Sequence, residues 1–154
     1  MPMHAPIVRP AFEHEHDEVA RVWMESWVST GLGEASNFLL ANLRARVRKE
    51  VEDGWSLFVA DDGGIFAAML ALHLPQNYLD QLFVAPEYQG QGIGRQLLAF
   101  TRQKLPDEIC LRCVRENEKA WRWYEREGFV YEKEEVSSVT GFMMKYYRWR
   151  REAG

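Results

Sequence analysis

Apolar residues recur at helical spacing in two segments of the first third of the chain. The first segment, from about His14 to Val28, repeats them every three or four positions, at Val19, Val22, Trp23 and Trp27. The second repeats them every fourth position, at Leu39, Leu43, Val47 and Val51, and Gly54 follows it. Both patterns predict amphipathic helices. The basic residues of the second helix fall on its other faces, at Arg44, Arg46, Arg48 and Lys49.

Runs of strand type occupy the middle of the chain. Trp55 to Ala60 and Ile65 to Leu74 are apolar runs joined by the Asp-Asp-Gly-Gly sequence at positions 61–64. These turn residues readily adopt the positive φ of a tight connection, so the pair predicts a β-hairpin. Tyr78 to Val84 forms a third run, and Ile7 to Arg9 is a short strand candidate near the N-terminus.

Two further helices alternate with strands in the second half. Apolar positions share a helical face from Gly92 to Leu105, where Pro106 ends the pattern. Asn117 is a suitable N-cap for a helix that runs to Glu127, with Gly128 directly after its end. The remaining runs predict strands, at Glu108 to Val114, Phe129 to Val136 and Phe142 to Trp149.

The predicted elements follow in the order β-α-α-β-β-β-α-β-α-β-β, which is typical of a mixed α/β sheet flanked by helices. No linker rich in proline, glycine or serine divides the chain, and 154 residues suit one core. Residues 1–154 are therefore expected to form one domain.

Charge and hydropathy narrow the class of partner. Lys plus Arg number 19 against 23 Asp plus Glu, a formal net charge of −4, so binding to a phosphate backbone is not expected. An acidic protein would tolerate a cationic acceptor, although net charge discriminates weakly. No apolar run approaches the roughly 20 residues that cross a bilayer, and the N-terminus lacks a targeting pattern. A cytoplasmic protein that binds no membrane is expected.

Two groups of residues could suggest metal or redox chemistry. Cys110 and Cys113 form a Cys-x-x-Cys pair, but they lie in a predicted strand, where residues three apart point to opposite faces. Buried thiols are the better interpretation. His14 and His16 have no further ligands nearby in the sequence, so no metal is expected.

A glycine-rich stretch carries the strongest chemical signal. From Gln89 to Arg95 the sequence Gln-Gly-Gln-Gly-Ile-Gly-Arg joins a strand to a helix. Glycine lets backbone N–H groups approach an anion closely, and a helix N-terminus favours negative charge. Arg95 stands where the dinucleotide fingerprint needs a glycine, and no Gly-Lys-Ser or Gly-Lys-Thr of a P-loop follows. A phosphate-binding loop is the favoured interpretation, and a glycine-rich turn without a ligand remains the alternative.

The segment from Gln89 to Gly94 resembles the Gln/Arg-x-x-Gly-x-Gly/Ala signature of the GNAT superfamily of acetyl-CoA-dependent N-acetyltransferases. A second family motif, Asn-x-x-Ala-x-x-x-Tyr-Glu-x-x-Gly-Phe, is matched downstream by Asn117, Ala120, Tyr124, Glu125, Gly128 and Phe129. The element order also resembles that of the family, so the similarity spans nearly all of the chain. It implies a mostly antiparallel central sheet that splays between its fourth and fifth strands.

The resemblance implies how acetyl-CoA would be held. Its pyrophosphate would lie on the backbone of Gln89, Gly90, Gln91, Gly92, Ile93, Gly94 and Arg95. Its pantetheine arm would pair like an added strand along Leu82, Phe83 and Val84, and Asn117, Ala120 and Tyr124 would form the other wall. The oxyanion donor would be a backbone N–H near a bulge of the fourth strand, around Phe83 or Val84.

Catalytic roles follow from the same resemblance. Tyr124 matches the general acid that protonates the departing thiolate, and a phenol with a pKa of about 10 is protonated at neutral pH. A core tyrosine that packs beneath its helix is the alternative. Asp80, on the fourth strand, is a candidate general base and should share a sheet face with Leu82. Water alone, or a structural ion pair of Asp80, are the alternatives.

The acceptor site in the family is built from the first two helices, their connection and the final strands. That supplies six candidates, namely Trp23, Trp27, Glu34, Asn37, Tyr78 and Tyr146, although both tryptophans also lie on the core stripe of their helix. The expected acceptor is a small-molecule amine, a peptide N-terminus or a lysine, and a homodimer is left open. A coenzyme-A-binding module without turnover and a transferase for longer acyl chains are the alternatives.

Overall fold

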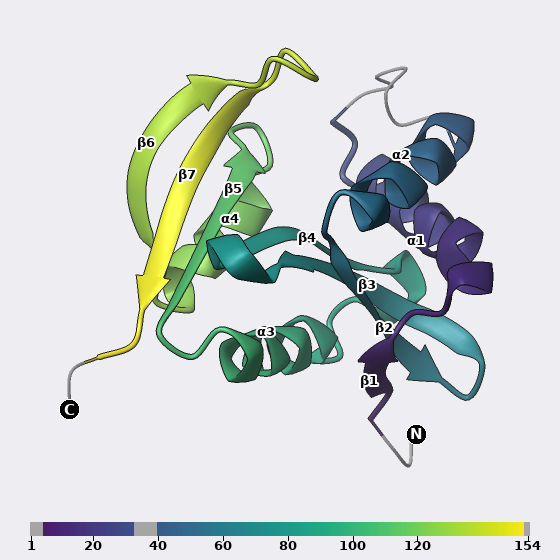
Figure 1. Ribbon diagram of the computed structural model, residues 1–154. Helices are drawn as coiled ribbons and strands as arrows, with labels where there is room; N and C mark the ends of the chain where they lie inside the picture. The colour runs from purple at the N-terminus through teal and green to yellow at the C-terminus, as the bar shows by residue number, and fades with distance from the viewer. Residues whose placement is uncertain (1–4, 33–39, 153–154) are drawn as a thin grey trace.

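The computed structural model describes residues 5–32 and 40–152, which fold around a seven-stranded sheet (Figure 1). The strands lie side by side in the order β1-β2-β3-β4-β5-β7-β6. Their bounds are β1 Ile7–Pro10, β2 Ser56–Asp62, β3 Ile65–His73, β4 Tyr78–Val84, β5 Glu108–Val114, β6 Val130–Val136 and β7 Met143–Arg150. The predicted class and element order are confirmed, and β4 and β5 have the predicted bounds.

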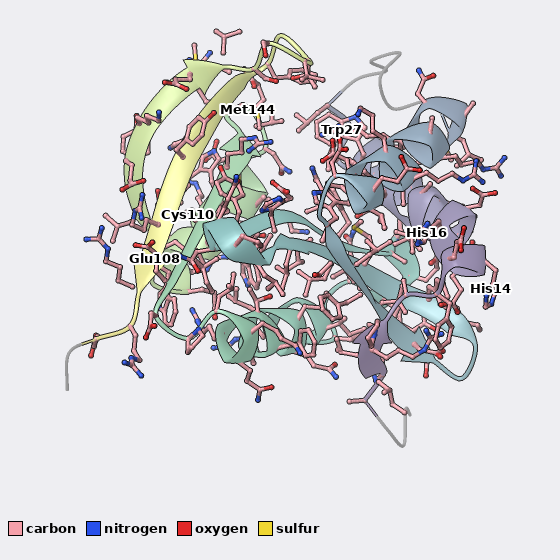
Figure 2. All side chains as sticks on the ribbon, in the orientation of Figure 1. His14, His16, Trp27, Glu108, Cys110 and Met144 are labelled. Carbon is pink, nitrogen blue, oxygen red and sulfur yellow. The ribbon has the colours of Figure 1, made fainter. Side chains whose placement is uncertain are left out.

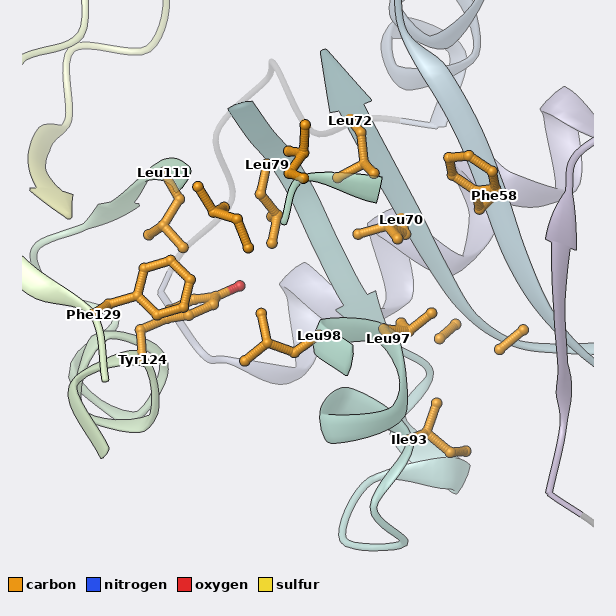
Figure 3. Packing of buried hydrophobic residues seen from close by; sticks show 14 of the residues in the cluster. Phe58, Leu70, Leu72, Leu79, Ile93, Leu97, Leu98, Leu111, Tyr124 and Phe129 are labelled. Atoms are coloured by element: carbon orange, nitrogen blue, oxygen red, sulfur yellow. The ribbon is translucent and has the colours of Figure 1, made fainter. Parts of the chain in front are cut away.

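Four helices cover the two faces of this sheet, with bounds α1 His16–Ser29, α2 Leu40–Glu52, α3 Ile93–Lys104 and α4 Glu118–Arg126. Helices α1 and α2 bury Trp23, Leu43 and Val47 in one core cluster. Helices α3 and α4 bury residues such as Leu97 and Tyr124 in a second cluster on the opposite face (Figures 1 and 3). The sheet therefore separates two cores, and a passage through it would connect the two sides.

Such a passage opens between β4 and β5. These are parallel neighbours, and among the described residues their register consists of one pair, Tyr78 with Cys110. Every other neighbouring pair of strands is antiparallel. Beyond Tyr78 the two strands diverge, so the edge of β4 that faces β5 lacks a partner strand. The splayed sheet that the family resemblance implied is thus present.

A β-bulge in β4 corrects one expectation about its faces. Leu82 pairs with Leu70 and Gln81 with Ala71, but Leu72 pairs with Leu79, so Asp80 is an extra residue. Leu82 packs against the α3 core, whereas Asp80 bonds to Trp55 on the α2 side. The prediction that Asp80 and Leu82 share a face is wrong, because a bulge interrupts the alternation of a regular strand. The bulge also lies at Asp80 instead of near Phe83 or Val84.

Smaller differences occur at element ends. The first helix is preceded by a 3-10 turn, Glu13–Glu15, so α1 begins at His16. Asn117 occupies the N-cap position of α4, but its side chain makes no capping hydrogen bond. Gly128 follows α4 with a φ of 98°, as its place after the helix predicts. On β5, Cys113 is buried and Cys110 is partly exposed, and both are free thiols.

Candidate active site

A cleft runs between β4 and β5 and encloses about 910 Å³ of space, part of it open to solvent. One wall comes from β4 and helices α1 and α2, and the other from β5, α4 and the β6–β7 hairpin. Trp27 and Met144, labelled in Figure 2, belong to these opposite walls. Because residues of both core clusters line it, the cleft connects the two faces of the sheet.

The glycine-rich loop leads into α3 on the opposite face from α1 and α2. Gly90 and Gly92 have φ values of 81° and 82°, the left-handed region in which residues other than glycine are strained. The backbone N–H groups from Gly90 to Arg95 donate no hydrogen bond to a described residue; the first to do so is that of Gln96, to Gly92. A row of free donors at a helix N-terminus can bind an anion.

Side chains hold this loop in shape from behind. The Gln89 amide donates to the carbonyl of Val84 at 3.1 Å, and the Gln91 amide donates to that of Glu87 at 3.3 Å. Gly94 has a different role, since a Cβ there would lie 3.4 Å from the ring of Trp123 in α4. The two glutamine side chains of the loop therefore fold back on the protein.

Arg95 extends from the first turn of α3 and is largely exposed. Its guanidinium lies 3.3 Å from the carboxylate of Glu127, just after α4. This surface ion pair is weak, because exposed charges are well solvated. Arg95 is consequently available for a charged contact at the mouth of the loop.

Tyr124 projects from α4 into the passage and is 6% exposed. Its ring packs edge-on against Phe129, and Figure 3 shows its hydroxyl directed away from the helix, toward Leu79 and Leu98. The hydroxyl bonds to no described residue. Burial raises the pKa of Tyr124 well above 10, with a further contribution from nearby Cys113. The phenol is therefore a protonated donor that lacks a protein acceptor.

Asp80 lines the same cleft from the bulge in β4. One carboxylate oxygen accepts a hydrogen bond from the Trp55 indole N–H at 2.6 Å. The other lies 3.9 Å from a guanidinium nitrogen of Arg112. Asp80 is thus held by two neighbours at the wall of the cleft.

Asn117 and Ala120 line the cleft on its α4 side, as predicted, and Leu82 and Phe83 line it on the β4 side. Because the Asn117 side chain does not cap α4, its amide is available to a ligand. Val84 is outside the lining, and its carbonyl accepts from Ser26 at 2.8 Å.

The predicted acceptor residues separate into three groups. Trp23 and Trp27 line the cleft while also packing in the interior, with Trp23 against Phe83 at a ring distance of 6.1 Å. Tyr78 and Tyr146 lie on β4 and β7 outside the cleft lining. The remaining two candidates, Glu34 and Asn37, are outside the described residues.

Sequence reasoning missed two arginines of the cleft. Arg46 in α2 and Arg112 in β5 both line it, whereas the sequence assigned Arg46 to a non-core face of its helix. Ser137, Thr140 and Phe142, from the β6–β7 connection, also line it and were not expected. The alternation in β5, with Leu111 and Cys113 facing one core, could have placed Arg112 on the other face.

The histidines near α1 serve structural roles away from the cleft (Figure 2). His14 stacks on Phe12 and His16 is buried, while Glu15 pairs with Arg9 at 2.7 Å. Across residues 5–32 and 40–152, no group of three or more His, Cys, Asp or Glu side chains is arranged to hold a metal ion. None of the described helices is long and apolar enough to cross a membrane.

Sequence comparison places the chain in a family. The model of the acetyltransferase (GNAT) domain matches residues 53–131, just over half of the 154 residues. This chain therefore belongs to the GNAT acetyltransferase family. No curated protein sequence matches it significantly.

Solved structures share the fold at low sequence identity. An acetyltransferase from Thermus thermophilus is 20% identical with a TM-score of 0.78, and the match covers 98% of this chain and 100% of the other. The PaiA N-acetyltransferase of Thermoplasma acidophilum, solved in complex with coenzyme A, is 20% identical with a TM-score of 0.68 and coverages of 97% and 100%. YncA of Salmonella typhimurium, a putative acetyltransferase solved with acetyl-CoA, is 14% identical with a TM-score of 0.69 and coverages of 97% and 96%.

Proposed function

We propose that this protein transfers the acetyl group of acetyl-CoA to a primary amine by direct attack within a ternary complex. The observation that carries the proposal is the cleft between β4 and β5, which is lined by a buried, protonated phenol. The loop of free backbone N–H groups before α3 lies outside that lining and follows the end of β4 in the chain. Membership of the GNAT family supports the reaction class.

The unpaired edge of β4 supports a place for the pantetheine arm. Backbone donors and acceptors of a strand need partners, and beyond Tyr78 the neighbouring strand no longer supplies them. Pantetheine contains two amides and can add to an open sheet edge in the way a peptide strand does. The pyrophosphate would then lie on the amides from Gly90 to Arg95, and the thioester would reach into the cleft.

In the reaction, the lone pair of a neutral amine attacks the thioester carbonyl and forms the C–N bond. The carbonyl oxygen becomes an oxyanion, which a backbone N–H of β4 near the bulge would stabilise. Collapse breaks the C–S bond, and Tyr124 gives its proton to the departing sulfur. The base or a water molecule takes the proton that the amine loses, and solvent returns a proton to Tyr124, so the numbers of protons lost and gained are equal.

Asp80 is the proposed general base, acting directly or through a water molecule. Its place in the cleft supports the role, while its contacts to Trp55 and Arg112 offer a purely structural alternative. Asp80→Asn keeps an oxygen acceptor for the indole. Loss of kcat with unchanged thermal stability would support the base, and an unchanged kcat would assign the proton to water.

The test is an acceptor screen with wild-type protein in which free thiol and acetylated product are both measured. We expect amine-dependent thiol release that matches product formation. Acetyl-CoA binding by calorimetry, with no turnover for any acceptor class, would instead identify a coenzyme-binding module. Faster transfer from longer acyl-CoA analogues would identify a different acyl donor.

A further inference from the structure

The part of the cleft on the α1 and α2 side carries an excess of positive charge. Among residues 5–32 and 40–152, the charged residues that line the cleft are two arginines and one aspartate, Arg46, Arg112 and Asp80. Asp80 and Arg112 belong to the face of the sheet opposite Tyr124, because their neighbours in sequence, Leu79 and Leu111, pack in the α3 and α4 core. The charges therefore gather on the acceptor side of the passage.

Arg46 forms no direct ion pair there with a described residue. Its guanidinium lies 5.0 Å from the ring centre of Trp23 and makes no ion pair or hydrogen bond with any described residue. Glu50, one turn further along α2, and Asp80 both attract it, but neither carboxylate forms an ion pair with it, and that of Asp80 is already bonded to Trp55 and faces Arg112. Burial lowers the pKa of Arg46, and nearby Arg112 adds to the effect. A partly desolvated cation without a direct ion pair is costly, and an anionic ligand would relieve that cost.

We propose that Arg46, assisted by Arg112, binds a carboxylate of the acceptor, so that the substrates are amines that also carry a carboxylate, of the amino-acid class. The inference rests on the proposed acetyl transfer and names the acceptor of that same site. A guanidinium offers paired N–H donors that match a carboxylate in a bidentate contact. The carboxylate of Asp80, which lines the same cleft, suits the amino group of the same molecule.

The coenzyme does not account for these arginines. Its diphosphate would lie on the loop before α3, whose apolar face packs in the core opposite to that of α2. Arg46 extends from α2, beside Leu43 and Val47 of the other core. Its only described ring contact is with Trp23, on the acceptor side. The position of Arg46 therefore suits an anionic group of the acceptor better than the diphosphate of the coenzyme.

The first experiment uses wild-type protein and compares matched acceptors. The standard α-amino acids, β-alanine and γ-aminobutyrate are each assayed beside the corresponding amide and the amine in which hydrogen replaces the carboxyl group. For the acceptor that reacts best, we expect kcat/KM to fall by about tenfold or more in both neutral forms. The aminophosphonate analogue, used as well as the carboxylate, would show that any anion suffices and would overturn the assignment to a carboxylate.

The second experiment uses variants of α2. Arg46→Gln should raise the acceptor KM by about tenfold or more, while the KM for acetyl-CoA stays unchanged, and Arg46→Lys should retain part of the affinity. Arg44→Gln, at an exposed position of the same helix, is the control and should alter neither constant. Thermal unfolding verifies that each variant is folded, and the acid-to-amide comparison needs no variant.

Other results would also overturn the inference. Equal use of acid and amide would remove the carboxylate contact while leaving acetyl transfer intact. A rise in the KM for acetyl-CoA alone in Arg46→Gln would assign the arginine to the coenzyme. If no amine of any charge is acetylated, the proposed function itself fails and the inference fails with it.

Discussion

Replacing Tyr124 by phenylalanine should separate activity from stability. The Tyr124 hydroxyl bonds to no described residue, so its removal leaves no protein group without a partner, and the free energy of unfolding should stay nearly constant. The same hydroxyl is the proposed donor to the departing sulfur. General acid catalysis contributes about 10²-fold or more, so kcat should fall by at least about 10²-fold, or roughly 2.7 kcal/mol of barrier.

Tyr147 supplies the matched control, because it is a second buried tyrosine in the same core cluster. Its hydroxyl donates to the Glu125 carboxylate at 2.7 Å. Tyr147→Phe removes that bond and should destabilise the protein by about 1–2 kcal/mol, because hydrogen bonds to charged groups contribute more than neutral ones. Turnover should remain close to that of wild type, since Tyr147 is not among the residues that line the cleft.

The assay is initial thiol release at saturating acetyl-CoA and acceptor, combined with thermal unfolding of each variant. A loss of about 1 kcal/mol lowers the midpoint by about 2–4 °C in a domain of this size. We expect Tyr124→Phe to lose turnover and keep the unfolding midpoint of wild type. We expect Tyr147→Phe to keep turnover and have a lower unfolding midpoint. Wild-type turnover in Tyr124→Phe, or an equal loss in both variants, would refute the assignment of the acid.

Three further predictions follow from the loop, the cleft and the N-terminal ion pair. Gly92→Ala should weaken acetyl-CoA binding and lower the free energy of unfolding by about 1–2 kcal/mol, because φ is positive there. Gly94→Ala is sterically tolerated and should raise the free energy of unfolding by about 0.5 kcal/mol. Calorimetry measures the binding of acetyl-CoA, and thermal unfolding measures the stability of each variant. Because the pKa of Tyr124 is raised above 10, kcat should show no descending limb up to pH 10, and a fall near pH 8 would contradict the acid role. The hydrogen bond from Arg9 lowers the pKa of Glu15 from 4.5 to about 2. This pair therefore stabilises the fold above pH 4.5, and its contribution is lost as the pH falls toward 2. In acid unfolding, Glu15→Gln should lose less stability than wild type between pH 4.5 and pH 2.

Most of the fold could be predicted because local patterns and tertiary packing agree. The strand from Tyr78 to Val84 has its predicted bounds, since its ends are set by turn residues that the sequence shows directly. The faces of that strand could not be predicted. A bulge at Asp80 adds one residue without any local signal, and period-two counting then assigns Leu82 to the wrong face.

The loop before α3 was more accessible to sequence reasoning than the cleft. A helix N-terminus preceded by glycines has a short, contiguous signature, so the positive φ of Gly90 and Gly92 could be anticipated from the sequence. The cleft combines Arg46, Arg112 and the β6–β7 connection, which are far apart in the chain. Their proximity depends on how the hairpin is placed beside α1 and α2, which spacing along the sequence does not encode.

The net charge of the chain differs in sign from the charge that lines the cleft. The chain carries −4 overall, which by itself favours a cation, yet the cleft has two arginines against one aspartate. Exposed charges more than about 8–10 Å apart are largely screened at physiological ionic strength. Inside the cleft water is partly excluded, so Arg46, Arg112 and Asp80 act on a bound ligand more strongly than the acidic residues of the outer surface do. Raising ionic strength should therefore alter the acceptor KM less than Arg46→Gln does, because salt screens the surface field but not a direct contact between a guanidinium and a carboxylate.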